Sequence, residues 1–288
     1  MVDENAWRRF WNRGGWWRAF LVAIVYIALY FGIGALLSPG FVSAGLIDPE
    51  NIFGDPLSIF FGIALPVLLG GVILLAFAAS LGWVRELFGP QPIGGRGWMW
   101  LAVVLVIVPV IIRLVATDWG SLSTAVVFSA LFMGLCVGFT EELLTRGIAV
   151  NLLRKAGHGE RTVFVLSSLI FALLHSSNVI SGQPPLTVAI TVIYTFGFGA
   201  MMYLALRVTG SLIWPMLLHA ATDPTTALAT GGIDVATSSS GSAQLISLAA
   251  LFNYGYVLFA IVAIFLVKNI VAKNTVAKNI LAKKQDLA

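Results

Sequence analysis

The sequence predicts an all-α, polytopic membrane protein of about eight transmembrane helices, with the N- and C-termini cytoplasmic. Of its 288 residues, 59% are hydrophobic and only 10% are charged, and the mean hydropathy is +0.94. A soluble domain carries about 25% charged residues, so this chain has too little polar surface to cover a water-facing globule. The net charge of +4 does not indicate nucleic-acid binding, because in a membrane protein the placement of charge matters more than its sum.

Eight apolar runs are candidate transmembrane helices, because a helix needs about 20 apolar residues to cross the hydrocarbon core. They lie at approximately 18–37, 58–80, 98–117, 122–142, 161–178, 186–206, 210–224 and 244–267. We expect the fourth helix to continue well past residue 142. The seventh run is short and weakly apolar.

The placement of charge supports this division. With the N-terminus in the cytoplasm, every Lys and Arg except Arg113, of 17 in the chain, falls in a cytoplasmic segment. Cytoplasmic loops are enriched in Lys and Arg. We expect Arg113, near the outer end of the third run, to extend its side chain toward the interface. The segments on the other side carry Asp48, Glu50, Asp55, Asp118 and Asp234.

Three regions follow from this pattern. Residues 1–17 form an amphipathic cytoplasmic N-terminus, whose Trp and Arg residues suit an interfacial anchor. Residues 18–267 form the transmembrane domain. Residues 268–288 form a basic cytoplasmic tail, for which binding to anionic lipid and disorder both stay open. The first apolar run is longer than a signal-peptide core, so we prefer an uncleaved helix to a signal peptide cut near Ala44.

The first cluster of ionisable residues inside the spans contains Glu141, Glu142 and Arg146. Such residues are costly in a membrane and suggest function. On a helix, Glu142 and Arg146 stand at i and i+4 with the acid first, the favourable order for an ion pair. Glu141 points about 100° away. One carboxylate is therefore neutralised by its neighbour, and Glu141 stays available as a general base.

His175 is expected at the same depth as Glu141. Each lies 17 residues from His158, the centre of a predicted turn at 157–159. In an antiparallel hairpin both would lie about 25 Å along the helix axis from that turn. The hairpin requires the fourth helix to reach about residue 156 and the fifth to begin at about 160. His158 itself is interpreted as a loop residue without a role.

A third cluster, His219 and Asp223, shares a helix face by its i, i+4 spacing. Pro215 and Pro224 bracket it, so we expect this helix to be kinked or interrupted.

A purely structural interpretation must be compared with a functional one. A single buried His–carboxylate pair is often only a contact between helices. Two histidines, two glutamates and an aspartate on three helices favour a catalytic or ligand-binding site. Taken alone, Phe171 would be a packing residue, and Gly197 and Gly199 are expected to let helices approach closely.

The residue types suit activation of water. Glu141 would take a proton from water, with His175 assisting or sharing a metal. His219 and Asp223 would bind the metal or stabilise an oxyanion. Zn²⁺ held by His175, His219 and Glu141 is one version of this site, and a mechanism without metal is the other. The chain has no His-Glu-x-x-His and no Gly-x-Ser-x-Gly motif.

Three motifs in order resemble those of the CPBP intramembrane proteases, which include the type II CAAX prenyl proteases and bacterial abortive-infection and bacteriocin-processing proteins. They are Glu141-Glu142-x-x-x-Arg146, Phe171-x-x-x-His175 and His219-x-x-x-Asp223, within about residues 120–225.

The resemblance implies an eight-helix core with a protease active site inside the membrane, open toward the cytoplasm. It implies that Glu141 is the catalytic carboxylate, that it acts with His175, and that His219 and the residue at 223 complete the site. Prenyl proteases typically have Asn at the last position. Asp223 departs from this, which favours a metal-binding or histidine-orienting role and puts prenylated substrates in question.

The leading hypothesis is a multi-pass cell-membrane endopeptidase, either a metalloenzyme or glutamate-dependent. Its partners would be membrane lipids and a peptide or lipidated protein substrate, with CAAX-type substrates included. The alternatives are a non-catalytic immunity or scaffold protein of the same fold, and a proton- or metal-coupled transporter. The sequence leaves the oligomeric state open.

Overall fold

A computed structural model describes residues 5–233 and 242–269. Within these residues the chain forms helices and no strand. The α-helices are α1 (Ala6–Asn12), α2 (Trp16–Ser43), α3 (Pro56–Ile59), α4 (Leu65–Leu81), α5 (Val84–Phe88), α6 (Trp100–Ala116), α7 (Thr124–Glu142), α8 (Val150–Lys155), α9 (Glu160–Leu174), α10 (Pro185–Thr209), α11 (Ile213–Thr230) and α12 (Ala243–Leu266).

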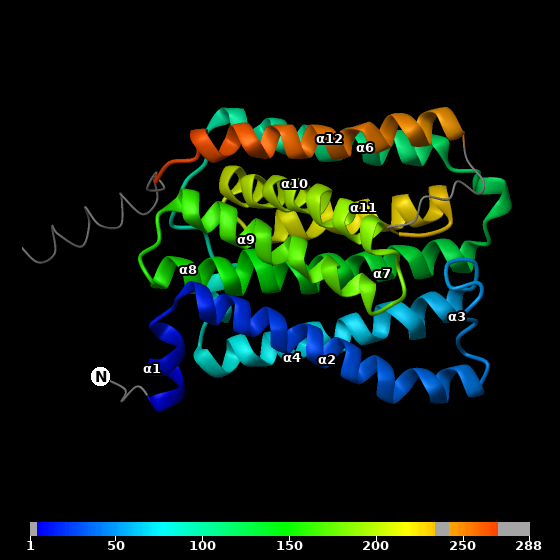
Figure 1. The fold of residues 1–288 in the computed structure, drawn as a ribbon, viewed down its shortest axis with the longest axis horizontal. Coiled ribbons are helices and arrows are strands. Elements are labelled where there is room, and N and C mark those ends of the chain that lie inside the picture. Colours follow the sequence, from blue (N-terminus) through cyan, green and yellow to red (C-terminus); the bar gives the residue numbers. More distant parts are fainter. Residues whose placement is uncertain (1–4, 234–241, 270–288) are drawn as a thin grey trace, which may run out of the picture.

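The long helices lie side by side in one bundle (Figure 1). In the described part of the chain, seven helices are long and apolar enough to cross a membrane. This confirms a polytopic all-α protein. The seventh predicted run forms α11, an eighth long helix that is more polar than the seven candidate spans and runs among them (Figure 1). It continues through both Pro215 and Pro224, so it is not interrupted, and the alternative expectation of a kink stays a prediction.

The predicted helical hairpin is present. A π-helical segment (Leu143–Ala149) joins α7 to α8, so one helical stretch runs from Thr124 to Lys155. Gly157, with φ of 78°, supplies the left-handed conformation of the turn, and α9 begins at Glu160. A 3₁₀ segment (His175–Val179) extends α9.

Glycines bring α11 and α12 close to their neighbours. A Cβ atom at Gly134 or Gly138 of α7 would overlap the backbone of α11. A Cβ at Gly197 of α10 would overlap Tyr256 and Val257 of α12, and one at Gly199 would meet Arg146 and Phe171. The expectation that Gly197 and Gly199 permit close packing is confirmed.

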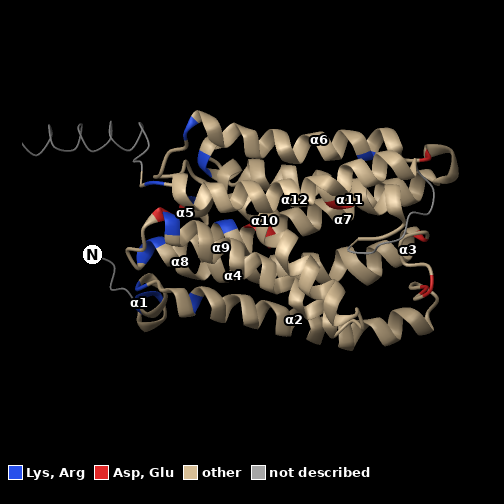
Figure 2. Ribbon diagram, turned by 45° about the horizontal axis from the view of Figure 1, so that its top comes forward, with Lys and Arg blue, Asp and Glu red and all other residues tan. Residues whose placement is uncertain are grey.

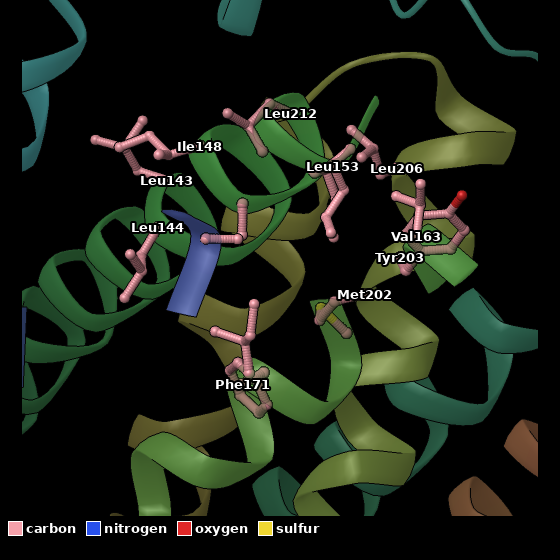
Figure 3. Packing of buried hydrophobic residues seen from close by; sticks show 14 of the residues in the cluster. Leu143, Leu144, Ile148, Leu153, Val163, Phe171, Met202, Tyr203, Leu206 and Leu212 are labelled. Atoms are coloured by element: carbon pink, nitrogen blue, oxygen red, sulfur yellow. The ribbon is translucent and has the colours of Figure 1, made fainter. Parts of the chain in front are cut away.

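Part of the apolar core lies where the π-helical segment packs against α9 and α10 (Figure 3). Leu143, Leu144 and Ile148 are fully buried there. Because every residue of this segment is buried, its one ionisable residue, Arg146, is held away from lipid.

The bundle has two ends of opposite charge (Figure 2). The basic end comprises α1, α8 and the connections 82–99, 156–159 and 210–212, and the acidic end comprises the connections 44–55, 117–123 and 180–184. Helix α1 and the end of α12 both lie at the basic end (Figure 1), as the charge pattern predicts. Trp7, Trp16 and Trp17 are exposed there. Most of the predicted basic tail lies outside the described residues.

Candidate active site

The ionisable residues singled out in the sequence surround one cavity. A cavity of about 670 Å³ is lined by Glu141 of α7, His175 at the end of α9, and His219 and Asp223 of α11. Phe171 also lies in its wall. Three separate helices therefore bring their acidic and imidazole groups together, as predicted.

Glu142 is the centre of a buried ionic contact between two helices. Its Oε1 atom lies 3.2 Å from Nη1 of Arg146 and 2.9 Å from Nδ1 of His219, and its side chain is fully buried. The contact with Arg146 confirms the predicted i, i+4 pair. The contact with His219 was not predicted, because two helices far apart in sequence meet there.

Both terminal nitrogens of Arg146 have hydrogen-bond partners, while its Nε has none among the described residues. Its Nη1 also donates to the hydroxyl of Thr145 at 2.6 Å, and its Nη2 donates to the carbonyl of Gly199. Its guanidinium carbon lies 4.5 Å from the centre of the Phe171 ring, a cation–π contact. Arg146 and Glu142 together therefore have a structural role beside the cavity.

Both ring nitrogens of His219 face carboxylates. Nδ1 contacts Glu142, and Nε2 lies 3.6 Å from Oδ2 of Asp223. The ring also packs edge-on against Phe171 and Phe198, with centroid distances of 5.6 and 5.1 Å. These contacts fix the orientation of the imidazole in the cavity wall.

Glu141 is the carboxylate that this network leaves available. Its Oε2 atom is buried and accepts no hydrogen bond from the described part of the chain. The π-helical segment begins two residues later, and π-helical turns are frequent at functional sites. Adjacent glutamates thus have different environments, as the 100° helical rotation predicts.

His175 is oriented by a carbonyl group. Its Nδ1 lies 3.1 Å from the carbonyl oxygen of Phe171. A carbonyl can only accept, so Nδ1 carries a hydrogen, and in the neutral form of the ring Nε2 has a lone pair. The rings of Phe171 and His175 are in contact, with centroids 5.1 Å apart. Phe171 therefore contacts both histidines and Arg146, and its role exceeds simple packing.

The donors expected for a metal do not converge. Among residues 5–233 and 242–269, no three His, Cys, Asp or Glu side chains are arranged to hold an ion. In the expected set of His175, His219 and Glu141, Nδ1 of His219 already contacts Glu142, which leaves Nε2 as the nitrogen of this ring with room for a further partner. The residues as placed do not fit a three-ligand zinc site.

Arg113 corrects one expectation. It does not extend to the interface: its side chain is only 8% exposed, and it lines the cavity. A signal for this was present in α6. Arg113 shares a face with Ala102, Val106 and Pro109, whereas large residues occupy the other faces. Small residues mark helix–helix contacts in membranes.

The cavity extends from the middle of the bundle to the acidic end. Its wall includes Phe53, Ser181 and Ile233 from connections at that end, and no residue from the basic-end connections 82–99, 156–159 or 210–212. If the basic end is cytoplasmic, the cavity leads to the opposite side of the membrane. The cytoplasmic opening implied by the resemblance therefore conflicts with the charge asymmetry.

The family model of type II CAAX prenyl endopeptidase Rce1-like proteins matches residues 96–225. The resemblance to this family of intramembrane proteases is confirmed. No curated protein matches the chain significantly. The matched segment contains all four candidate residues and begins earlier than the 120 expected from the motifs, so it adds α6 and Arg113 to the protease-like region. The match supports a CAAX-type endopeptidase in general, and with the seven apolar helices it supports a multi-pass membrane location.

Proposed function

We propose that this protein is an intramembrane endopeptidase in which Glu141 and His175 activate water to hydrolyse a membrane-bound or lipid-modified peptide. The observation that carries the proposal is that the Glu141 carboxylate lines the same cavity as His175 and forms no ion pair with a described residue. An unpartnered Oε2 atom is common to Glu141 and Glu142, but Glu142 is paired with two cations and does not line this cavity. A general base must be able to reach water and must not be neutralised by a neighbouring cation. Glu141 meets both conditions, whereas Glu142 does not.

The proposed reaction uses the two residues in sequence. Glu141 takes a proton from a water molecule while the lone pair on Nε2 of His175 holds the other hydrogen. The resulting hydroxide attacks the carbonyl carbon of the peptide bond. The C–N bond then breaks, and the proton held by Glu141 passes to the leaving nitrogen.

His219 and Asp223 complete the site in this proposal. The separation of 3.6 Å between Nε2 of His219 and Asp223 is longer than a normal hydrogen bond. A substrate oxygen can therefore approach this side of the imidazole, where the oxyanion develops. Asp223 then orients the ring, in line with the replacement of the usual Asn.

The proposal is tested with purified protein in phosphatidylcholine nanodiscs and a prenylated CAAX-type peptide, alongside its unprenylated counterpart. Glu141→Gln is expected to lower the cleavage rate by at least about 100-fold, because a general base contributes roughly that much. Glu50→Gln, in an exposed acidic-end connection, is the matched control. Products are identified by mass spectrometry. Wild-type cleavage by Glu141→Gln would exclude the proposed base.

A chelation arm separates the two chemical versions. Activity that survives 1,10-phenanthroline supports the glutamate-dependent mechanism. Activity that is lost with the chelator and restored by zinc supports a metalloenzyme. Biological activity that persists without any peptide cleavage favours the scaffold alternative.

One observation favours a second candidate function, coupled transport. A smaller cavity of about 230 Å³ at the basic end is lined by Arg146, Asn151 and Arg154. Glu142 contacts both Arg146 and His219. Arg146 lines the smaller cavity and His219 lines the larger one, so Glu142 connects the two. Buried ionic relays of this kind occur in transporters. Proton uptake by proteoliposomes that is lost in Glu142→Gln would favour this function.

A further inference from the structure

Arg113 is a buried cation in the cavity wall with one unpartnered nitrogen. Its Nη1 atom is buried and makes no hydrogen bond, and its guanidinium forms no ion pair with any described residue. Asp223 lies within electrostatic reach of Arg113, yet its nearest cationic contact is His219. An unpaired buried charge is unfavourable. Arg113 therefore has room for an anionic partner beyond those that the described residues form as ion pairs with it.

A second unpartnered donor lies in the same wall. The hydroxyl of Tyr256 on α12 is buried without a hydrogen-bond partner, and Tyr256 interacts electrostatically with Arg113. Helices α6 and α12 lie side by side (Figure 1). Arg113 and Tyr256 line the cavity that also contains Glu141. A guanidinium and a phenol together offer the N–H and O–H donors that suit a carboxylate or a phosphate.

We propose that Arg113, assisted by Tyr256, binds the terminal carboxylate of the peptide substrate. This rests on the proposed endopeptidase function, and it adds a residue that selects substrates by their free C-terminus. A cavity of about 670 Å³ accommodates a short peptide segment. An extended chain advances about 3.3–3.6 Å per residue. A carboxylate fixed at Arg113 therefore determines which peptide bond reaches Glu141.

The same donors could bind the phosphate of a phospholipid. We favour the peptide carboxylate, because the donors share one cavity with the unpartnered carboxylate of Glu141, where a peptide bond must lie for hydrolysis. Competition by phosphatidylglycerol distinguishes a bound lipid phosphate from a bound peptide carboxylate.

The test measures binding, so it does not depend on cleavage. The probe is an acetylated tripeptide of valine, isoleucine and methionine, prepared as the free acid and as the C-terminal amide. Binding to the wild-type chain is measured by calorimetry in phosphatidylcholine nanodiscs. We expect the acid to bind about 10- to 100-fold more tightly than the amide. Arg113→Gln should abolish this preference, and Arg113→Lys should keep part of it.

Two controls keep the test decisive. Arg96→Gln, at an exposed site of the basic end, should keep the full preference for the acid. Arg113→Met should unfold at the wild-type temperature or higher, because it removes an unpaired buried charge. Marked destabilisation by Arg113→Met would instead show a structural role and overturn the proposal. Equal binding of acid and amide by the wild type, or binding of neither, would also overturn it.

Lipid competition and the cleavage assay distinguish two further outcomes, a lipid-binding site and an anion site in a protein without peptidase activity. Competition by phosphatidylglycerol that disappears in Arg113→Gln, without any acid preference among the peptides, assigns the site to a lipid phosphate and overturns the carboxylate proposal. Acid preference that depends on Arg113, in a protein that cleaves no peptide, upholds the anion site while refuting the proposed function.

Discussion

The neighbouring carboxylates Glu141 and Glu142 should respond to the same substitution in opposite ways. Glu142→Gln removes the charge shared by Arg146 and His219, both of which are buried. Breaking a buried ion pair by removing one partner costs about 3–5 kcal/mol. The glutamine carbonyl keeps one acceptor, so we place the loss near the lower end, at about 3 kcal/mol. That lowers the ratio of folded to unfolded protein by roughly 100-fold.

Glu141→Gln should leave stability unchanged or raise it. No described group donates a hydrogen bond to Oε2 of Glu141, so the neutral amide removes an unpaired charge without leaving a cation behind. We expect the two variants to separate clearly. Glu142→Gln should unfold more easily and lose part of the activity of its folded fraction, because Glu142 also orients His219, whereas Glu141→Gln should be stable and inactive.

The assay is thermal unfolding followed by tryptophan fluorescence in nanodiscs, combined with the peptide-cleavage rate of the folded fraction. The double variant Glu142→Gln, Arg146→Gln closes a double-mutant cycle. Removing both charges should be less destabilising than the sum of the single changes. Equal stability of Glu142→Gln and wild type would refute the assignment of Glu142 as a structural ion-pair residue. So would a greater loss of stability in Glu141→Gln.

Two further predictions concern the ends of the bundle. Glu160→Gln should destabilise the protein by about 3 kcal/mol, because Glu160 is buried between two arginines. Glu86 forms an exposed pair with a lysine, so Glu86→Gln should cost at most about 1 kcal/mol. Thermal unfolding measures both changes. A cysteine at Ser181 should react with a membrane-impermeant thiol reagent in intact cells, and one at His158 only after permeabilisation, while the native Cys136 is buried. The reverse labelling pattern would place the acidic end in the cytoplasm.

The hairpin of α7 and α9 could be predicted because it depends on local rules. The turn at 157–159, the equal spacing to Glu141 and His175, and the i, i+4 pair all follow from helical geometry. The same rules separate Glu141 from Glu142 by rotation about the helix axis. No contact with a distant helix is needed for these conclusions.

Contacts between distant helices could not be predicted in this way. The contact of His219 with Glu142 depends on how closely α11 approaches α7, and Gly134 and Gly138 permit that approach. The pairing of Arg207 with Glu160 is similar, because it joins α10 to α9 deep in the basic end. An apolar helix such as α6 gives only a weak indication of which face is inward, so the burial of Arg113 was missed.

The direction in which the cavity extends now limits the possible substrates. In the sequence, all but one of the 17 Lys and Arg residues fall in segments predicted to be cytoplasmic, and the exception, Arg113, is buried in the cavity wall. The cavity wall reaches only the acidic-end connections. Prenylated proteins presented from the cytoplasm could not enter from that side without crossing the bilayer. If the charge asymmetry is obeyed, the substrate of the proposed reaction must reach the cavity from the acidic end. Labelling of the Ser181 position therefore decides which side of the membrane the cavity faces.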